Sequence, residues 1–156
     1  MLEIRRTNSE NTDFAYLIKL LDKFLKVTDG DEHDFYNQFN NIDVLKHIVV
    51  IYSNNKPVGC GAFKEYNSNT IEIKRMFTHE EFRNQGVASK TLKALEDWAI
   101  ELNYSSSIIE TGVRQIEAVQ FYKNKDYLMI PNYGQYENRP NSICFEKELT
   151  KNEKRQ

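Results

Sequence analysis

The residues from Arg83 to Ser89 have the types and spacing to hold an anion. They follow an apolar run that ends at Thr78, contain the single glycine Gly86, and lead into an amphipathic segment. A strand that passes through a short loop into a helix leaves backbone N–H groups unpaired at the helix start, and these groups and the helix dipole favour a negative charge. A glycine lets the loop backbone approach a phosphate closely. The pattern predicts a phosphate or pyrophosphate site, and a plain turn glycine at a helix start fits it equally well.

Hydrophobic periodicity predicts the elements that position this segment. Helices are expected from Thr12 (as N-cap) to Leu25, around Phe35, Tyr36 and Phe39, from Val87 to Asn103, and over 115–126. The third of these helices is expected to bury Leu92, Leu95, Trp98, Ala99 and Leu102. Strands are expected at 2–6, 47–52, 57–66, 70–78, 106–111, 127–131 and 141–149. Hairpin strands followed by strand–helix–strand–helix–strand predict an α/β sandwich with a mixed sheet.

Composition narrows the class of protein. A chain of 156 residues predicts one domain, over residues 1–149, with a solvated tail at 150–156. A net charge of −2 gives no basic surplus, so no nucleic-acid partner is expected. The two cysteines, Cys60 and Cys144, have no CxxC spacing, which predicts reduced thiols in a cytoplasm. The longest apolar run, 48–52, is far shorter than the roughly 20 residues that cross a membrane, and no signal peptide is recognised.

The anion-binding segment resembles motif A of the GNAT superfamily of N-acetyltransferases. That motif is Arg/Gln-x-x-Gly-x-Gly/Ala after a central strand, and Arg83, Gly86 and Ala88 match it. A second family signature is matched further along the chain by Ala118, Tyr122 and Tyr127. Two positions depart from it, because Gln115 stands where Asn is usual and Asp126 stands where Gly is usual. The resemblance covers roughly residues 45–148.

The resemblance implies a GNAT-like mixed central sheet flanked by helices, with acetyl-CoA in a V-shaped gap between the strands at 70–78 and 106–111. Backbone groups of Met76 and Thr78 would pair with the pantetheine arm. The N–H groups of 84–89 would hold the pyrophosphate, so no metal is needed. The implied coenzyme contacts are Met76, Phe77, Thr78, Arg83, Asn84, Gln85, Gly86, Val87, Ala88, Ser89, Gln115 and Tyr122.

Three residues are candidates for moving protons. Tyr122 stands where the family places the acid that protonates the leaving thiolate, and its plainer interpretation is a core aromatic. Glu72 and Glu110 each match a base position of different family members, and each is otherwise an ordinary strand glutamate. A carboxylate base is suited to deprotonating an amine whose pKa is near 10.4. The uninterrupted strand and loop between Glu72 and Arg83 favour Glu72, and proton loss through ordered water is the remaining alternative.

The resemblance also implies that the acidic stretch at 29–36 covers the acceptor site. Asp29, Asp31, Glu32 and His33 are the substrate-binding candidates there, and an acidic N-cap is the alternative interpretation. The long loop at 130–140 contributes Tyr133 as a candidate for the opposite wall. His33 has no second histidine at ligand spacing, so a metal site is not expected.

These features predict an acetyl-CoA-dependent N-acetyltransferase that acts on a primary amine of a small molecule or amino acid. One alternative is an acetyltransferase for protein lysines or N-termini, and another is a non-catalytic acyl-CoA-binding regulatory module. Assembly as a homodimer is left open by the sequence.

Overall fold

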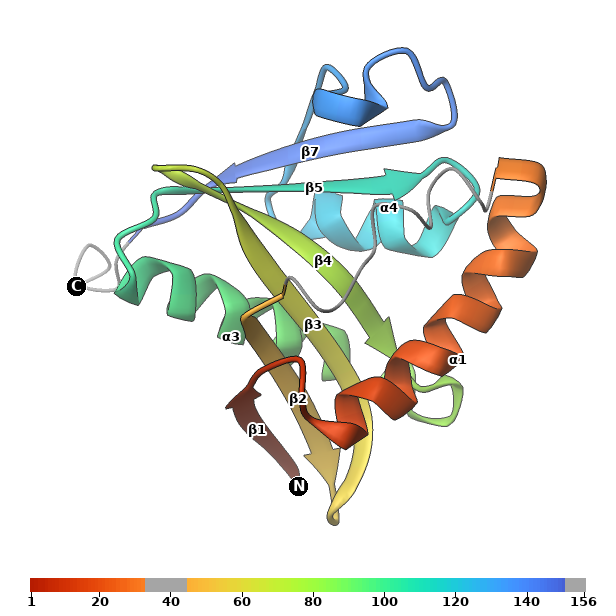
Figure 1. The fold of residues 1–156 in the computed structure, drawn as a ribbon, viewed down its shortest axis with the longest axis vertical. Coiled ribbons are helices and arrows are strands. Elements are labelled where there is room, and N and C mark those ends of the chain that lie inside the picture. Colours follow the sequence, from red (N-terminus) through yellow and green to blue (C-terminus); the bar gives the residue numbers. More distant parts are fainter. Residues whose placement is uncertain (33–44, 151–156) are drawn as a thin grey trace.

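A twisted mixed sheet forms the centre of the molecule in the computed structural model, which describes residues 1–32 and 45–150 (Figure 1). Its seven strands lie in the order β1-β2-β3-β4-β5-β7-β6. Their bounds are β1 Leu2–Thr7, β2 His47–Ser53, β3 Lys56–Asn67, β4 Thr70–Thr78, β5 Ser106–Gly112, β6 Leu128–Ile130 and β7 Ser142–Glu148. All neighbours are antiparallel except β4 and β5, which are parallel. The mixed α/β sheet expected from the sequence is therefore confirmed.

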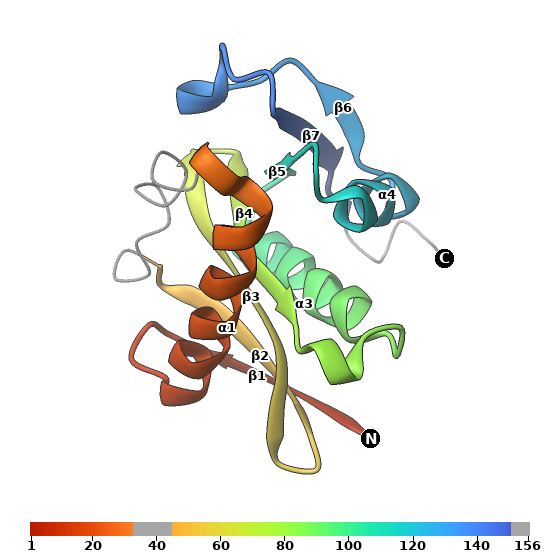
Figure 2. The ribbon, with the colours of Figure 1, turned by 90° about the vertical axis from the view of Figure 1, so that its right-hand side faces the viewer.

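Helices cover both faces of the sheet (Figure 2). Helix α1 (Thr12–Asp29) lies on one face, and α3 (Val87–Glu101) and α4 (Ile116–Asn124) lie on the other. The centre of β2 is continuously apolar because both of its faces are buried. Ile48 and Val50 pack in the cluster under α1, whereas Val49 and Ile51 pack in the cluster under α3. Short 3₁₀ turns lie at η1 Gly30–Glu32, η3 Glu80–Phe82 and η4 Gly134–Tyr136.

The start of α1 differs from the sequence-based expectation. Asn11, rather than Thr12, is the N-cap, and its side-chain oxygen accepts a hydrogen bond of 2.8 Å from the backbone N–H of Phe14. Asn11 lies directly before the helix, so its amide oxygen can reach an unpaired N–H of the first turn, whereas the Thr12 hydroxyl is already inside the helix. The helix predicted around Phe35 lies outside the described residues.

The ends of α3 and α4 also differ from expectation. Helix α3 ends at Glu101, so Leu102 becomes its C-cap and is 43% exposed instead of buried. Helix α4 is shorter than the predicted 115–126, because Gln115 is its N-cap and Lys125 its C-cap. The other residues expected in the core of α3 are buried, apart from Trp98, which is half-buried.

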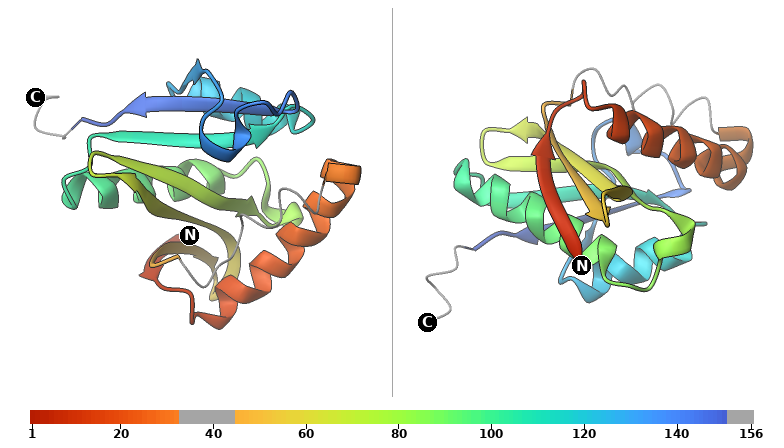
Figure 3. Two further views of the ribbon diagram at one scale, coloured as in Figure 1. Left: turned by 45° about the horizontal axis from the view of Figure 1, so that its top comes forward. Right: turned by 90° about the horizontal axis from the view of Figure 1, so that it is seen from below.

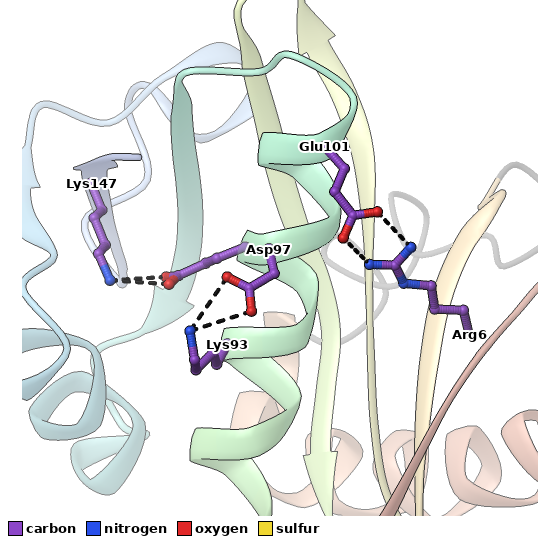
Figure 4. Close-up of polar contacts among 6 residues, drawn as sticks. Arg6, Lys93, Asp97, Glu101 and Lys147 are labelled. Carbon is purple, nitrogen blue, oxygen red and sulfur yellow. Dashed lines mark hydrogen bonds and ion pairs between the residues drawn. The ribbon is translucent and has the colours of Figure 1, made fainter. Parts of the chain in front are cut away.

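Ion pairs connect α3 to strands on both sides of the β4–β5 pair (Figure 4). Glu101 accepts two hydrogen bonds, of 2.9 and 2.6 Å, from the Arg6 guanidinium of β1. Lys147 of β7 donates to Glu96 at 3.0 Å, and Lys93 pairs with Asp97 at 3.3 Å along the helix. The polar face of α3 is thus held against β1 and β7 while its apolar face packs on the sheet.

Strands β4 and β5 separate shortly after they begin. They pair at only three positions, Thr70 with Ser106, Ile71 with Ser107 and Glu72 with Ile108. Beyond Glu72 the two strands diverge toward their C-terminal ends (Figure 3, left). The split that the resemblance implied is therefore present, and it lies between the predicted strands.

Candidate active site

Two cavities meet where β4 and β5 diverge. The larger has a volume of about 850 Å³ and the smaller about 110 Å³. Five residues line both, so the cavities are contiguous: Leu21, Met76, Arg114, Gln115 and Tyr122. A volume near 850 Å³ is in the range of pockets that bind sizeable small molecules, whereas the smaller cavity holds roughly ten water-sized volumes.

The larger cavity includes the predicted anion-binding segment. Of the residues at 83–89, all but Gln85 line it, together with Met76, Phe77 and Thr78 at the end of β4. Gly86 has a φ of 81° as the N-cap of α3, and a Cβ placed there would meet nothing within 4 Å. The positive φ explains why glycine is favoured at this position. The open space beside it leaves the first N–H groups of α3 accessible to a negatively charged group.

Tyr122 lies at the junction of the two cavities. It is 4% exposed, and its ring packs on Tyr127 at a centroid distance of 5.8 Å. Burial raises the pKa of Tyr122 well above its ordinary value, so the hydroxyl carries its proton at neutral pH.

Asp126, which stands where the family has glycine, adopts a φ of 73°. The glycine-like backbone between α4 and β6 is thus retained by a residue type that tolerates it.

Glu72 and Glu110 line the smaller cavity from opposite strands. Glu72 is 3% exposed and accepts a hydrogen bond of 3.0 Å from the Tyr133 hydroxyl. The ammonium groups of Lys74 and Lys64 lie 3.8 and 4.0 Å from its oxygens. Glu110 is half-buried on β5, two residues beyond the last β4–β5 pair. The structure therefore brings both predicted base candidates to one cavity and surrounds Glu72 with donors.

Lys74 is a buried cation in the same wall. Its side chain is 7% exposed, and its ammonium donates a long hydrogen bond of 3.4 Å to the Tyr136 hydroxyl. Burial lowers the pKa of Lys74, and the nearby Glu72 charge opposes that shift. Burial and the Glu72 charge raise the pKa of Tyr133. Lys74 and the two tyrosines thus form a hydrogen-bonded polar cluster around Glu72.

The predicted acceptor residues have different outcomes. Glu32 lines the smaller cavity and accepts a hydrogen bond of 2.6 Å from Asn141. Tyr133 reaches Glu72, and Tyr136 from the same loop lines the cavity. The side chains of Asp29 and Asp31, and all of His33, lie outside the described parts of the chain.

Sequence reasoning missed several residues of this site. Arg114 lines both cavities and donates to the Thr28 carbonyl at 3.1 Å, which links the start of α4 to the end of α1. Leu21 and Leu25 of α1 also line the smaller cavity. Arg114 stands directly before the second family signature, and this position could have indicated its place in the site. The side chains of α1 carried no such signal, because their apolar spacing indicates only a packed helix.

No group of three or more metal-ligating side chains occurs among residues 1–32 and 45–150. In the same residues, no helix combines the length and the apolar character that a membrane crossing needs.

Comparison with known proteins assigns the family. The chain matches the Acetyltransferase (GNAT) family over residues 14–127 and belongs to it. It is 31% identical over 93 residues to the IAA acetyltransferase of Azospirillum brasilense, which covers 59% of this chain and 61% of that protein. The match thus spans about three fifths of that relative's length.

Solved structures share the fold over nearly the whole chain. A protein from Klebsiella pneumoniae assigned to the acyl-CoA N-acyltransferases superposes with a TM-score of 0.80 and 25% identity, covering 96% of this chain and 99% of that one. A GNAT family acetyltransferase from Elizabethkingia anophelis, solved with acetyl-CoA bound, has a TM-score of 0.67 at 19% identity and covers 95% and 98% of the two chains. The predicted GNAT-like sheet with its flanking helices is confirmed.

Proposed function

We propose that the protein transfers an acetyl group from acetyl-CoA to the primary amine of a small molecule or amino acid. One observation carries the proposal: the large cavity beside the α3 N-terminus joins the small polar cavity at Met76 and Tyr122. A donor held in the first cavity would present its thioester to an amine held in the second. The relative solved with acetyl-CoA bound supports the choice of donor.

The chain supplies each function that amine acetylation needs. A carboxylate accepts the proton that the amine must lose before it attacks the thioester carbonyl. A backbone N–H of Met76 or Phe77 stabilises the negative charge that forms on the carbonyl oxygen. Tyr122 then donates its proton as the C–S bond breaks, so that coenzyme A leaves as the thiol. The nitrogen is cationic after the attack and gives up its second proton to the Tyr122 phenolate, which restores the hydroxyl. The products are the amide and the thiol, and the base releases the first proton to solvent.

We favour Glu110 as the base and assign Glu72 to holding the acceptor amine. Glu72 already accepts the Tyr133 hydrogen bond and is flanked by Lys74 and Lys64. Glu110 faces the same cavity from β5, beyond the point where the strands stop pairing. This preference reverses the one that strand continuity suggested for Glu72.

The small volume of the second cavity supports a small acceptor. Leu21, Leu25 and Thr28 of α1 and Glu32 of η1 form its wall on one side. Both cysteines, Cys60 and Cys144, are buried and free, which supports a reducing cytoplasmic setting. The single seven-stranded sheet supports one domain over residues 1–149.

A thiol-release screen tests the proposal. Purified protein is incubated with acetyl-CoA and a panel of small amines, amino acids and basic peptides, and free coenzyme A is measured with a thiol reagent. Release that depends on a small amine is expected, with the acetylated amine confirmed by mass spectrometry. Release with peptides alone would favour a protein acetyltransferase, and binding without release would favour a regulatory module.

A further inference from the structure

The backbone of β4 is irregular at Arg75. Cys60 pairs with Phe77 and Ala62 pairs with Lys74, so Gly61 of β3 faces two residues, Arg75 and Met76. This is a β-bulge, and Arg75 occupies it with a φ of 60°. Glycine is the residue that this left-handed conformation favours. An arginine at the bulge therefore has to be explained by its side chain.

The side chain of Arg75 is buried, and one hydrogen-bond partner contacts it within residues 1–32 and 45–150. Its Nη2 donates to Asp22 Oδ1 of α1 at 2.7 Å, and the side chain is 3% exposed, whereas that of Asp22 is 42% exposed. Nε and Nη1 are buried and have no hydrogen-bond partner among the residues that the structure describes. Unpaired buried donors and a strained φ both destabilise a fold. Glycine would remove both penalties, so fold stability alone does not account for this arginine.

The bulge lies beside the proposed reaction centre. It begins three residues after Glu72, the last residue of β4 that pairs with β5. Arg75 lines the smaller cavity, and its neighbour Met76 lines both cavities. Neither residue has a partner in the β3–β4 register. The bulge therefore removes the Met76 backbone from the ladder at the point where the thioester carbonyl would lie.

We propose that Arg75 is a positioning residue, whose ion pair with Asp22 fixes the bulge so that the Met76 N–H points at the thioester carbonyl. The inference rests on the proposed function, because it places acetyl-CoA in the split between β4 and β5. Asp22 contributes by anchoring the guanidinium to α1, which crosses this face of the sheet (Figures 1 and 2). Loss of either partner lets the bulge relax and weakens polarisation of the carbonyl.

The test uses the carbonyl itself as the reporter, so no acceptor is needed. Isotope-edited infrared spectroscopy of [1-¹³C]acetyl-CoA measures the thioester carbonyl band free and bound to the wild type, Arg75→Gly and Asp22→Asn. Calorimetry gives the acetyl-CoA affinity, and thermal unfolding gives Tm. Asp13→Asn is the matched control, because Asp13 lies on the same helix and accepts a 2.7 Å hydrogen bond from Tyr52, away from the bulge.

Binding to the wild type is expected to move the band to lower frequency, and Arg75→Gly is expected to lose most of that shift. Its Tm should equal or exceed that of the wild type, and its affinity should stay within about twofold. Asp22→Asn should lose most of the shift and also lower Tm, because it removes the negative charge that compensates the buried guanidinium. With an acceptor in hand, kcat of both variants should fall about 10²-fold, as for loss of an oxyanion donor.

A band that shifts equally in the wild type and Arg75→Gly would overturn this inference while leaving the donor assignment intact. A lower Tm for Arg75→Gly with an unchanged band would show a purely structural role and also overturn it. Absence of acetyl-CoA binding to the wild type would overturn the proposed function and this inference together. Asp13→Asn should keep the wild-type shift, and its loss would contradict a local effect of Arg75.

Discussion

The hydroxyl of Tyr133, in the loop before β7, donates a 3.0 Å hydrogen bond to Glu72, near the start of β4. Glu72 is almost fully buried, so this bond and the adjacent Lys74 ammonium compensate for the water that the carboxylate has lost. Tyr133 is also packed edge-on against Tyr66 at 5.4 Å, which fixes the ring. Through Tyr133, the loop at 130–140 therefore holds the Glu72 carboxylate in place.

Replacement of Tyr133 by phenylalanine should reduce stability and acceptor binding together. The ring packing remains, but the buried Glu72 loses its donor, and hydrogen bonds to charged groups contribute roughly 1.5–3 kcal/mol. Chemical denaturation measures the change in free energy of unfolding, and initial rates measure KM for the amine. Tyr136→Phe is the comparison variant, because it removes a hydroxyl that accepts a 3.4 Å hydrogen bond from Lys74, whereas the Tyr133 hydroxyl donates a 3.0 Å hydrogen bond to Glu72. An equal loss in both variants would contradict a special role for Tyr133.

Replacement of Gly86 by glutamate should abolish donor binding. The glutamate must keep a backbone φ of 81°, which L-residues rarely adopt, and its side chain places a negative charge at the start of α3. Acetyl-CoA affinity measured by calorimetry is expected to fall at least about 10²-fold. Gly134→Glu is a matched control at another positive φ, 52°, outside the larger cavity. Unchanged affinity in the Gly86 variant would refute the coenzyme assignment.

Replacement of Tyr122 by phenylalanine should lower kcat and leave the acetyl-CoA affinity unchanged. The ring remains in its buried position, but the proton donor for the leaving thiolate is lost, which typically reduces the rate about 10²–10⁴-fold. Steady-state kinetics and calorimetry give the two quantities. Near-normal turnover would show that water protonates the thiolate.

The two glutamates are distinguished by the pH dependence of the rate. Glu110→Gln should remove the acidic limb of the kcat/KM profile, since activity falls at low pH only where a base becomes protonated. Glu72→Gln should keep the limb and chiefly raise KM for the amine. The reverse pattern would make Glu72 the base, and retention of the limb with normal kcat in both variants would assign the proton to ordered water.

The buried thiol of Cys60 should make the protein alkali-sensitive. Burial raises the pKa of Cys60 from 9.0 to about 12, so the unfolded state loses this proton before the folded state does. The stability that comes from keeping this thiol protonated is fully present below pH 9 and is lost as pH rises toward 12. The loss amounts to about 1.4 kcal/mol at pH 10. Unfolding free energies of the wild type and Cys60→Ala between pH 8 and 11 should therefore converge. Parallel curves would contradict the shift.

The elements were largely predictable because each strand and helix has its own periodic signal. The range of β4 was predicted correctly at both ends, and the glycine at 86 correctly indicated the start of α3. The misplaced ends have local causes, such as the Asn11 cap and the turn that exposes Leu102. The ends of a helix depend on the hydrogen bonds of its terminal residues, which hydrophobic periodicity does not predict.

The candidate site was predictable only where a motif continued along one stretch of chain. The residues at 83–89 and Tyr122 belong to such motifs, and all of them except Gln85 line the larger cavity. The Tyr133–Glu72 bond and the Arg75–Asp22 pair join residues 61 and 53 positions apart. A contact of that separation depends on tertiary packing, and neither partner has a pattern that points to the other.

The three rungs between β4 and β5 make the sheet two mechanical units with a narrow seam. Helix α3 acts as a brace across that seam, because Arg6 holds it to the β1–β4 half and Lys147 to the β5–β7–β6 half (Figure 4). Beyond these three pairs the facing backbones of β4 and β5 no longer bond each other. An extended molecule that hydrogen-bonds to both strands would bridge them there. Such a ligand would splint the halves together, and it would slow amide exchange at residues 106–108 although it touches none of them.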